Sequence, residues 1–353
     1  RGMSEQPFRK DREEPQRLGR YLLLELLAAG GMAEIHLARH IGIEGFRKLL
    51  IIKRIHKHLA LDPRFVEMFF DEARITVELQ HTNIVRVFDL DRDGEFVYLA
   101  MEFVDGMDAL TLMIECEERG VTVPFGPLLY IISETLRGLL HAHMAADMYG
   151  RPLGLIHRDI SPGNILLGIN GAVKLSDFGV ARASISRRSE EPGMLVGKLR
   201  YFSPELLMGG EASQQSDIFA VGTCLYEMLA MQPLFPPAET VFQQQLHVRD
   251  WSVEAMLEQH LNFPDGVDDI LRRALAKDPA DRYQTAQHFL EDCIDLAHES
   301  QIRLGDIAMI NFIKELRKAS MEAPAQSVQH EQPTTRFRDE SRGDGEAAAP
   351  EVL

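Results

Sequence analysis

The chain has 353 residues, of which 45% are hydrophobic and 26% are charged, a composition that suits a globular protein of one or two domains. Its net charge of −16 argues against nucleic acid as the main ligand, and its three distant cysteines indicate free thiols in a reducing compartment. No apolar run reaches the ~18 residues that a membrane span needs, and the start has no secretory leader, so we expect a cytoplasmic protein without a membrane span.

The first part of the chain has the pattern of a small lobe rich in strands. Residues 1–19 are polar and are expected to be flexible, with Arg1-Gly2 foreign to a natural protein that starts at Met3. Strands are predicted at 22–27, 35–38, 49–52, 84–88 and 96–99. A helix is predicted to follow the third strand, because Asp62-Pro63 combines an N-cap residue with proline in the first turn.

After Asp105-Gly106 the pattern changes to helices. Helices are predicted at 128–143, 217–231, 240–248, 268–277, 284–298 and 306–318, and short strands at 155–156, 165–168 and 173–175. A strand-rich part followed by a helix-rich part predicts an α+β fold with two lobes and a cleft between them. We expect an N-terminal lobe and hinge at 20–104, a C-terminal lobe at 105–298, a helical extension at 299–321 and a disordered tail at 322–353.

Oxygen-bearing side chains in the loops between 157 and 179 suggest phosphoryl transfer, which needs mainly positioning and charge stabilisation. Asp159 ends the triplet His157-Arg158-Asp159, Asn164 follows in the same loop, and Asp177 opens Asp177-Phe178-Gly179. Asp159 could orient a substrate hydroxyl for attack. Asn164 and Asp177 offer the hard oxygen ligands that Mg²⁺ prefers.

A lysine and a glutamate further upstream could complete this site. Lys53 ends an apolar strand, where its ammonium group could reach the phosphates of ATP. Glu72 lies in the helix predicted after Asp62, and an ion pair with Lys53 would hold the ammonium in place.

Together these motifs, with Ser203-Pro204-Glu205, resemble those of eukaryotic-like (Hanks-type) protein kinases, and they are most similar to the bacterial serine/threonine branch. The resemblance covers about residues 20–298. It implies the bilobal protein-kinase fold, with an antiparallel sheet and one helix in the N-lobe and a mainly helical C-lobe. It also implies that Arg282 pairs with Glu205 and that Asp217, with Gly222, anchors the catalytic loop.

The resemblance further implies an ATP site with Mg²⁺ or Mn²⁺, the hinge Met101–Val104 beside adenine and Asp108 near the ribose. The residues implied to contact the nucleotide are Ala28, Gly30, Gly31, Ala33, Ile35, Ile51, Lys53, Met101, Glu102, Val104, Asp108 and Leu166. The phosphate-covering loop, residues 28–33, keeps only the middle glycine of the usual G-x-G-x-x-G pattern, so we expect a stiffer loop and weaker nucleotide binding. Ile51 replaces a usual alanine and is expected either to narrow the adenine pocket or to shift the base.

Ser161 stands where most serine/threonine kinases carry a lysine that neutralises the γ-phosphate. Lys198 follows Gly197, at a position where these kinases usually place a threonine. We hypothesise that Lys198 reaches back beside Ser161 and restores the missing charge as a catalytic group. The alternative is that Lys198 is a solvated residue of the activation segment.

The segment between Asp177 and Ser203 contains three serines and no threonine: Ser184, Ser186 and Ser189. Arg158 is the family's usual receptor for a phosphate on this segment, so autophosphorylation of one of these serines is a hypothesis.

The sequence therefore predicts a serine/threonine protein kinase that transfers the γ-phosphate of Mg·ATP to a protein substrate in bacterial signalling. The rival interpretation is a pseudokinase acting as a nucleotide-binding scaffold. The departures at 28, 33, 51 and 161 support that rival, whereas the intact Lys53, Glu72, Asp159, Asn164 and Asp177 oppose it. A small-molecule kinase is disfavoured by the Ser203-Pro204-Glu205 segment. The resemblance also suggests a homodimer through the N-lobe.

Overall fold

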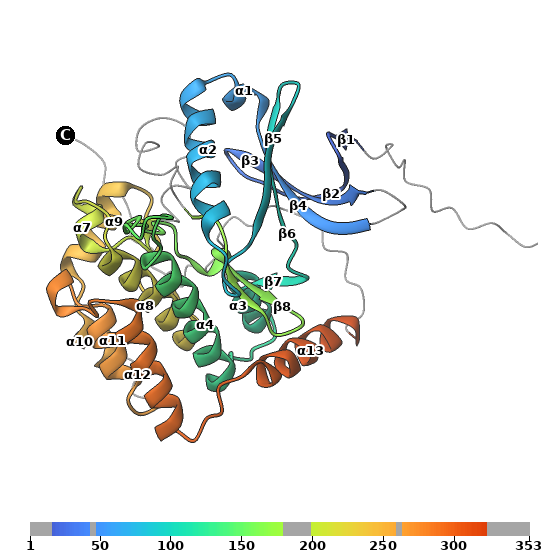
Figure 1. The fold of residues 1–353 in the computed structure, drawn as a ribbon. Helices are drawn as coiled ribbons and strands as arrows, with labels where there is room; N and C mark the ends of the chain where they lie inside the picture. The colour runs from blue at the N-terminus through green and yellow to red at the C-terminus, as the bar shows by residue number, and fades with distance from the viewer. Residues whose placement is uncertain (1–15, 43–46, 179–198, 259–262, 323–353) are drawn as a thin grey trace, which may run out of the picture.

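The computed structural model describes residues 16–42, 47–178, 199–258 and 263–322. The chain forms two lobes, a sheet with helix α2 alongside it and a larger helical lobe (Figure 1). The predicted bilobal α+β fold is therefore confirmed. In the described parts of the chain, no helix combines the length and the apolar character that crossing a bilayer requires.

The N-lobe sheet is antiparallel throughout and has the strand order β1-β2-β3-β4-β6-β5. Its strands are β1 (Arg17–Leu18), β2 (Tyr21–Ala29), β3 (Ala33–Ile41), β4 (Arg47–Ile55), β5 (Val87–Asp93) and β6 (Phe96–Glu102). A hairpin turn at Asp93-Gly94 joins β5 to β6, and Gly94 has the positive φ that such a turn needs.

The strand predicted at 84–88 begins too near the N-terminus, because β5 begins only at Val87. The preceding residues pair instead with the C-lobe. The Val85 amide donates to the Leu175 carbonyl at 2.8 Å, and the Leu175 amide donates to the Asn83 carbonyl at 2.8 Å. These long-range partners hold residues 83–85 outside the sheet and link the two lobes.

Helix α2 (Pro63–Glu78) follows a short helix, α1 (Lys57–Ala60). The predicted start signal is confirmed, because the Asp62 side chain accepts a hydrogen bond from the Arg64 amide at 2.9 Å. Phe69 and Ala73, at helical spacing, are buried against the sheet. The burial of this apolar face fixes α2 beside the strand that carries Lys53.

The C-lobe is built around α8 (Gln214–Ala230), a helix that is buried along most of its length. The other α-helices described here are α3 (Ala109–Glu118), α4 (Phe125–His143), α7 (Pro204–Leu207), α9 (Val241–Asp250), α10 (Val253–Glu258), α11 (Val267–Ala274), α12 (Ala286–Glu299) and α13 (Asp306–Glu322). A small sheet lies below the hinge, with strands β7 (Gly106–Asp108), β8 (Ile165–Gly168) and β9 (Val173–Leu175).

The strand predicted at 155–156 is wrong, since these residues form no strand. They lead into the segment at 157–158, whose amides bond to a side chain rather than to a neighbouring strand. Alternating apolar residues alone could not reveal this side-chain partner.

Helix α13 contacts α4, begins beside its lower end and runs below the small sheet (Figure 1). It buries Met309, Ile313 and Leu316 in the C-lobe core. Arg119 of the α3 C-terminus donates to the Leu316 carbonyl. The predicted helix at 306–318 is therefore confirmed as a helix and extends to Glu322.

Gly171, in the β8–β9 turn, is expected to be intolerant of alanine. It has φ +86°, and a Cβ there would lie 2.5 Å from the Cβ of Asp306 on α13. Gly94→Ala is a matched control, because Gly94 has φ +61° and open space around it. The control should lose about 1–2 kcal/mol of unfolding free energy for the backbone conformation alone, and Gly171→Ala should lose at least about 1 kcal/mol more through overpacking. Equal losses in urea unfolding would contradict the close packing of α13 on this turn.

Candidate functional site

The loop at 157–164 is anchored from below by Asp217, which lies in the first turn of α8 and is 1% exposed. Its carboxylate accepts hydrogen bonds from the backbone amides of His157 at 2.7 Å and Arg158 at 2.9 Å. Arg158 has φ 66°, a left-handed conformation that is unfavourable for an arginine and that these bonds help to hold. The predicted anchoring role of Asp217 is consistent with this geometry.

A third partner of Asp217 was missed by sequence reasoning. The His143 Nε2 atom lies 2.9 Å from Asp217 Oδ2, and both side chains are 2% exposed. His143 is the last residue of α4, and nothing in its local sequence distinguishes it from an ordinary polar helix end. Only the packing of α4 against α8 makes it part of the anchor.

His157 joins this loop to the one that begins at Ser176. Its Nε2 atom donates to the Ser176 carbonyl at 3.1 Å, and its Nδ1 atom accepts from the Asp159 amide at 3.3 Å. The ring also contacts Phe178, with centroids 4.4 Å apart. Burial lowers the pKa of His157, and the two hydrogen bonds suit a neutral ring that carries its proton on Nε2.

Acid is expected to destabilise the fold through His157. Because the folded-state pKa is lowered, the unfolded chain binds this proton more readily, and the free energy of unfolding falls as the pH drops below about 6.5. Protonation would also place a second N–H opposite the Asp159 amide. Urea unfolding at pH 7.5 and 5.5 should show a smaller pH dependence for His157→Phe than for the wild type. The same pH dependence in both proteins would contradict this role.

The structure brings together the predicted residues Asp159, Asn164 and Asp177. Asn164 ends the turn η2 (Pro162–Asn164), and its Nδ2 atom donates to the Asp159 carbonyl at 2.6 Å. The Asn164 carbonyl accepts from the Ser176 amide at 2.9 Å, one residue before Asp177. Asp177 has φ 55°, a second left-handed residue in this small region. Three oxygen-bearing side chains from adjoining loops therefore have their backbones fixed to one another.

Lys53 joins this cluster from the N-lobe. Its Nζ atom lies 2.7 Å from Asp177 Oδ1, and the two side chains are 15% and 36% exposed. Lys53 lies on β4, directly opposite Ile35 of β3 and Leu99 of β6. Glu72 lies on α2, but its side chain is outside the part that the structure describes, so the predicted Lys53–Glu72 pair stays a prediction.

The apolar residues predicted to line the adenine site lie together. The pairing of β4 with β6 places Ile51 opposite Met101, and both are 9% exposed. Ile35, Val104 and Leu166 pack against the same cluster from β3, the hinge and β8. The pairing of strands in the N-lobe and the position of β8 in the C-lobe thus bring five of the predicted residues together in one apolar wall.

The two predicted acids near the hinge have partners that the sequence did not indicate. Glu102 forms an ion pair with Lys174 at 3.1 Å and accepts from the Arg86 amide at 3.2 Å. Asp108 caps α3, since its carboxylate accepts from the Thr111 amide at 2.8 Å and the Thr111 hydroxyl at 3.0 Å. Their predicted contacts with the nucleotide stay predictions.

The phosphate-covering loop is a tight turn between β2 and β3. Ala28 pairs with Ile35, and the Gly30 amide donates to the Ala33 carbonyl at 2.9 Å. Gly31 lies at the tip, with open space where a side chain would project. The four predicted loop residues Ala28, Gly30, Gly31 and Ala33 therefore lie at the end of the hairpin next to β4.

The described residues of the Ser203-Pro204-Glu205 segment are tied to the rest of the C-lobe. Arg282 donates two hydrogen bonds of 2.8 Å to the Glu205 carboxylate, and its side chain is fully buried. Further bonds from Arg282 reach the carbonyls of Gln215, Ala276 and Lys277. The predicted Glu205–Arg282 pair is present, and it serves the scaffold rather than the chemistry.

Several predictions concern residues outside those that the structure describes: Ser184, Ser186, Ser189, Gly197 and Lys198. Ser161 is described, and its carbonyl accepts from the Asn164 amide at 3.0 Å. Ser161 therefore lies directly before the η2 turn that ends at Asn164, and two residues after Asp159.

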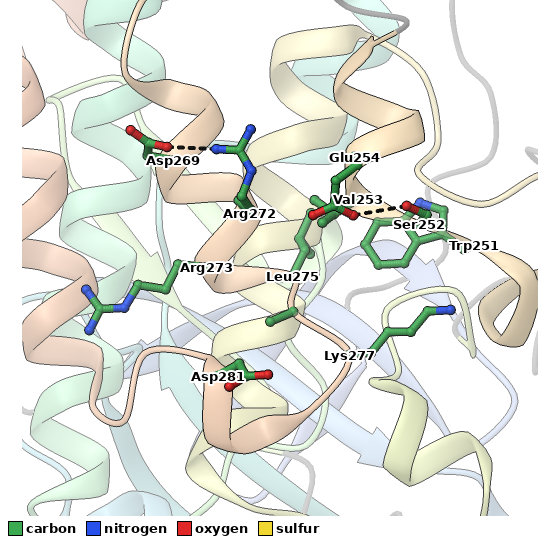
Figure 2. Close-up of a pocket in the computed structure, with 11 residues that line it drawn as sticks. Trp251, Ser252, Val253, Glu254, Asp269, Arg272, Arg273, Leu275, Lys277 and Asp281 are labelled. Carbon is green, nitrogen blue, oxygen red and sulfur yellow. Dashed lines mark hydrogen bonds and ion pairs between the residues drawn. The ribbon is translucent and has the colours of Figure 1, made fainter.

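A hollow of about 520 Å³ lies in the C-lobe between α10, α11 and the segment after α11 (Figure 2). It is lined by Trp251, Glu254, Arg272, Lys277 and Asp281, among others, and none of the predicted site residues contributes to it. Arg272 is paired with Asp269 at 2.7 Å, and Lys277 donates to the Arg249 carbonyl at 2.7 Å. Because cations and anions alternate around this hollow, its charge favours no class of ligand.

Comparison with known proteins identifies the family. The model of the protein kinase domain matches residues 21–293. The tyrosine-protein kinase MasK of Myxococcus xanthus is 37% identical over 314 residues, which cover 85% of this chain and 46% of MasK. The serine/threonine-protein kinase PknB of Mycolicibacterium smegmatis is 34% identical, over 81% of this chain and 44% of PknB. PrkC of Bacillus subtilis, also a serine/threonine-protein kinase, is 33% identical, over 78% of this chain and 40% of PrkC.

The chain thus spans less than half the length of these relatives. Among solved structures, the kinase domain of PknI from Mycobacterium tuberculosis superposes with a TM-score of 0.56 at 25% identity, covering 82% of this chain and all of that domain. These similarities agree with the site geometry described above. The chain belongs to the protein kinase family, in its bacterial Hanks-type branch, and this family uses ATP and a divalent cation to phosphorylate proteins.

Proposed function

We propose that this chain transfers the γ-phosphate of Mg·ATP to a serine or threonine hydroxyl of a protein substrate. The observation that carries the proposal is the 2.7 Å contact between Lys53 Nζ and Asp177 Oδ1, beside the linked loops of Asp159 and Asn164. It places a cation from one lobe against the oxygen-rich loops of the other, which is the arrangement that a bound triphosphate requires.

The donor set suits Mg²⁺ and would also accept Mn²⁺. Asn164 and Asp177 offer one amide and one carboxylate oxygen, and Mg²⁺ is commonly held by one or two carboxylates together with substrate phosphates. Among the described residues no cluster of three histidine, cysteine or acidic side chains offers a dedicated metal cage. When bound, the metal ion neutralises charge on the phosphate oxygens.

The protein's own residues would supply the remaining steps. Lys53 would hold the phosphates, with Glu72 as its positioning partner. Asp159 would accept a hydrogen bond from the substrate hydroxyl and orient it for in-line attack. The backbone bonds to Asp217 and His157 would keep Asp159 in place while the substrate binds.

The choice of acceptor is a separate part of the proposal, because MasK carries the name of a tyrosine kinase. We favour serine and threonine on two grounds: PknB and PrkC carry that name, and the segment at 178–202 contains a single tyrosine, Tyr201, which is 8% exposed. Purified chain would be incubated with radiolabelled ATP and a mixed protein substrate, and the products hydrolysed to phosphoamino acids. Phosphoserine or phosphothreonine is expected. Label confined to phosphotyrosine would overturn the acceptor assignment.

A pseudokinase is the second candidate, and Ser161 is the observation that favours it, because the turn beside Asp159 lacks the usual lysine. A scaffold of this kind would bind ATP in calorimetry yet incorporate no label into any protein.

The homodimer through the N-lobe is also a proposal; Leu26 and Leu27 of β2, 52% and 47% exposed, could contribute to it. The three cysteines are free and buried, which supports a reducing, cytoplasmic environment.

A further inference from the structure

A histidine outside the sequence motifs contacts the phosphate-covering loop. His56 directly follows β4, three residues after Lys53. Its Nε2 atom lies 2.6 Å from the Gly30 carbonyl, and its backbone amide donates to the Met32 carbonyl at 3.1 Å. A carbonyl can only accept, so the ring nitrogen is the donor. We propose that His56 is a positioning residue that orients the Gly30–Met32 loop for the phosphates of ATP; this inference rests on the proposed function.

The direction of these two bonds determines where the loop amides point. In a trans peptide the carbonyl and the following N–H point in opposite directions. With the Gly30 and Met32 carbonyls directed at His56, the amides of Gly31 and Ala33 point away from it. Backbone amides presented in this way are the groups that bind phosphate oxygens in glycine-containing loops. The side chain of His56 thus fixes the orientation of the Gly30–Gly31 peptide, and its backbone amide fixes that of the Met32–Ala33 peptide.

The ring of His56 is itself held in place. Its Nδ1 atom lies 3.8 Å from Glu34 Oε1, and Arg54 pairs with the same carboxylate at 2.5 Å. The hydrogen bond from Arg54 lowers the pKa of Glu34, so this carboxylate stays ionised behind the ring. The ring of His58 stacks on His56, with centroids 5.6 Å apart and planes at 14°. A continuous series of contacts therefore runs from Arg54 through Glu34 and His56 to Gly30.

The hydrogen bond from His56 to the Gly30 carbonyl would reduce the conformational entropy that the loop loses when it binds phosphate. Gly30 and Gly31 are adjacent, and glycine has more backbone freedom to lose than any other residue. Ordering this pair around phosphate would oppose binding unless another group restricts it beforehand. A side-chain bond to the Gly30 carbonyl restricts it before ATP arrives.

Three variants of the whole chain test the inference. His56→Ala removes the ring, His56→Gln replaces it with an amide that can still donate to the Gly30 carbonyl, and His288→Ala, at an exposed position on α12, is a control. Isothermal calorimetry with Mg·ATP and, separately, with adenosine separates phosphate contacts from base contacts. For His56→Ala, Kd for Mg·ATP should rise about 3- to 10-fold, the loss expected for one ordinary hydrogen bond. Adenosine binding should be unchanged, and the kinetic effect should fall mainly on KM for ATP rather than on kcat.

The outcomes separate this inference from the proposed function. His56→Gln is expected to recover most of the ATP affinity, and His288→Ala should match the wild type. Wild-type ATP affinity in His56→Ala, equal losses for ATP and adenosine, or no recovery in His56→Gln would each overturn the positioning role. A wild-type chain that binds ATP without phosphorylating any substrate would overturn only the proposed function. A wild-type chain that binds no ATP would overturn both.

Discussion

Asp159→Asn is expected to lower kcat by about 10²- to 10⁴-fold, the usual contribution of a positioned acid or base to proton transfer. Asparagine keeps the shape of the side chain but cannot take the proton of the substrate hydroxyl. The fold should survive, because Asp159 contacts His157 through its amide and Asn164 through its carbonyl, and both groups remain in the variant. Initial rates at saturating ATP, together with the thermal unfolding midpoint, would measure the two effects separately.

The matched control for this variant is Asp250→Asn, which makes the same change at an exposed position at the end of α9. Asp250 pairs with the neighbouring Arg249 and is the last residue of α9, outside the loop at 157–164. Its kcat should equal that of the wild type. If Asp159→Asn kept activity within a few-fold of this control, Asp159 would not be the residue that orients the hydroxyl.

Lys198→Ala is expected to lower kcat by about 10²- to 10³-fold, the loss found when one group aimed at transition-state charge is removed. Ser161 directly precedes the η2 turn, between Asp159 and Asn164, and it offers no cation to the transferring phosphate. If Lys198 supplies that cation, its ammonium is needed in the transition state more than in the ATP complex. The effect should therefore appear in kcat, with KM for ATP changing little.

A double variant tests whether turnover depends on a positive charge near the transferring phosphate, whichever residue supplies it. Ser161→Lys combined with Lys198→Thr returns the cation to the turn and should recover much of the lost activity. Lys314→Ala, at an exposed position on α13, serves as the lysine control and should behave as the wild type. Near-normal turnover of Lys198→Ala would show instead that Lys198 is a solvated residue of its segment.

The parts of this protein that follow local rules could be predicted from the sequence. The helix start at Asp62-Pro63 depends on one capping side chain and one proline, and it lies where predicted. The catalytic loops could be located because their residue types occur at characteristic spacings along the chain. The residues of the apolar wall, Ile51 and Met101 among them, were implied by the resemblance to the kinase family, and the pairing of β4 with β6 places these two opposite each other.

The remaining features depend on partners far away in the sequence. The segment at 83–85 leaves the predicted strand because Leu175, some ninety residues later, supplies its hydrogen bonds. His143 joins the anchor only through the packing of α4 on α8, and His56 reaches the loop only because β3 and β4 pair in one register. The spacing of residues within a motif and the capping of a helix involve residues that are close together in the sequence. The family, the motifs and most of the helices and strands could therefore be determined from the sequence alone. The partners of the buried and strained groups were decided by the tertiary structure, because unsatisfied polar groups take whichever donor or acceptor the folded chain brings near.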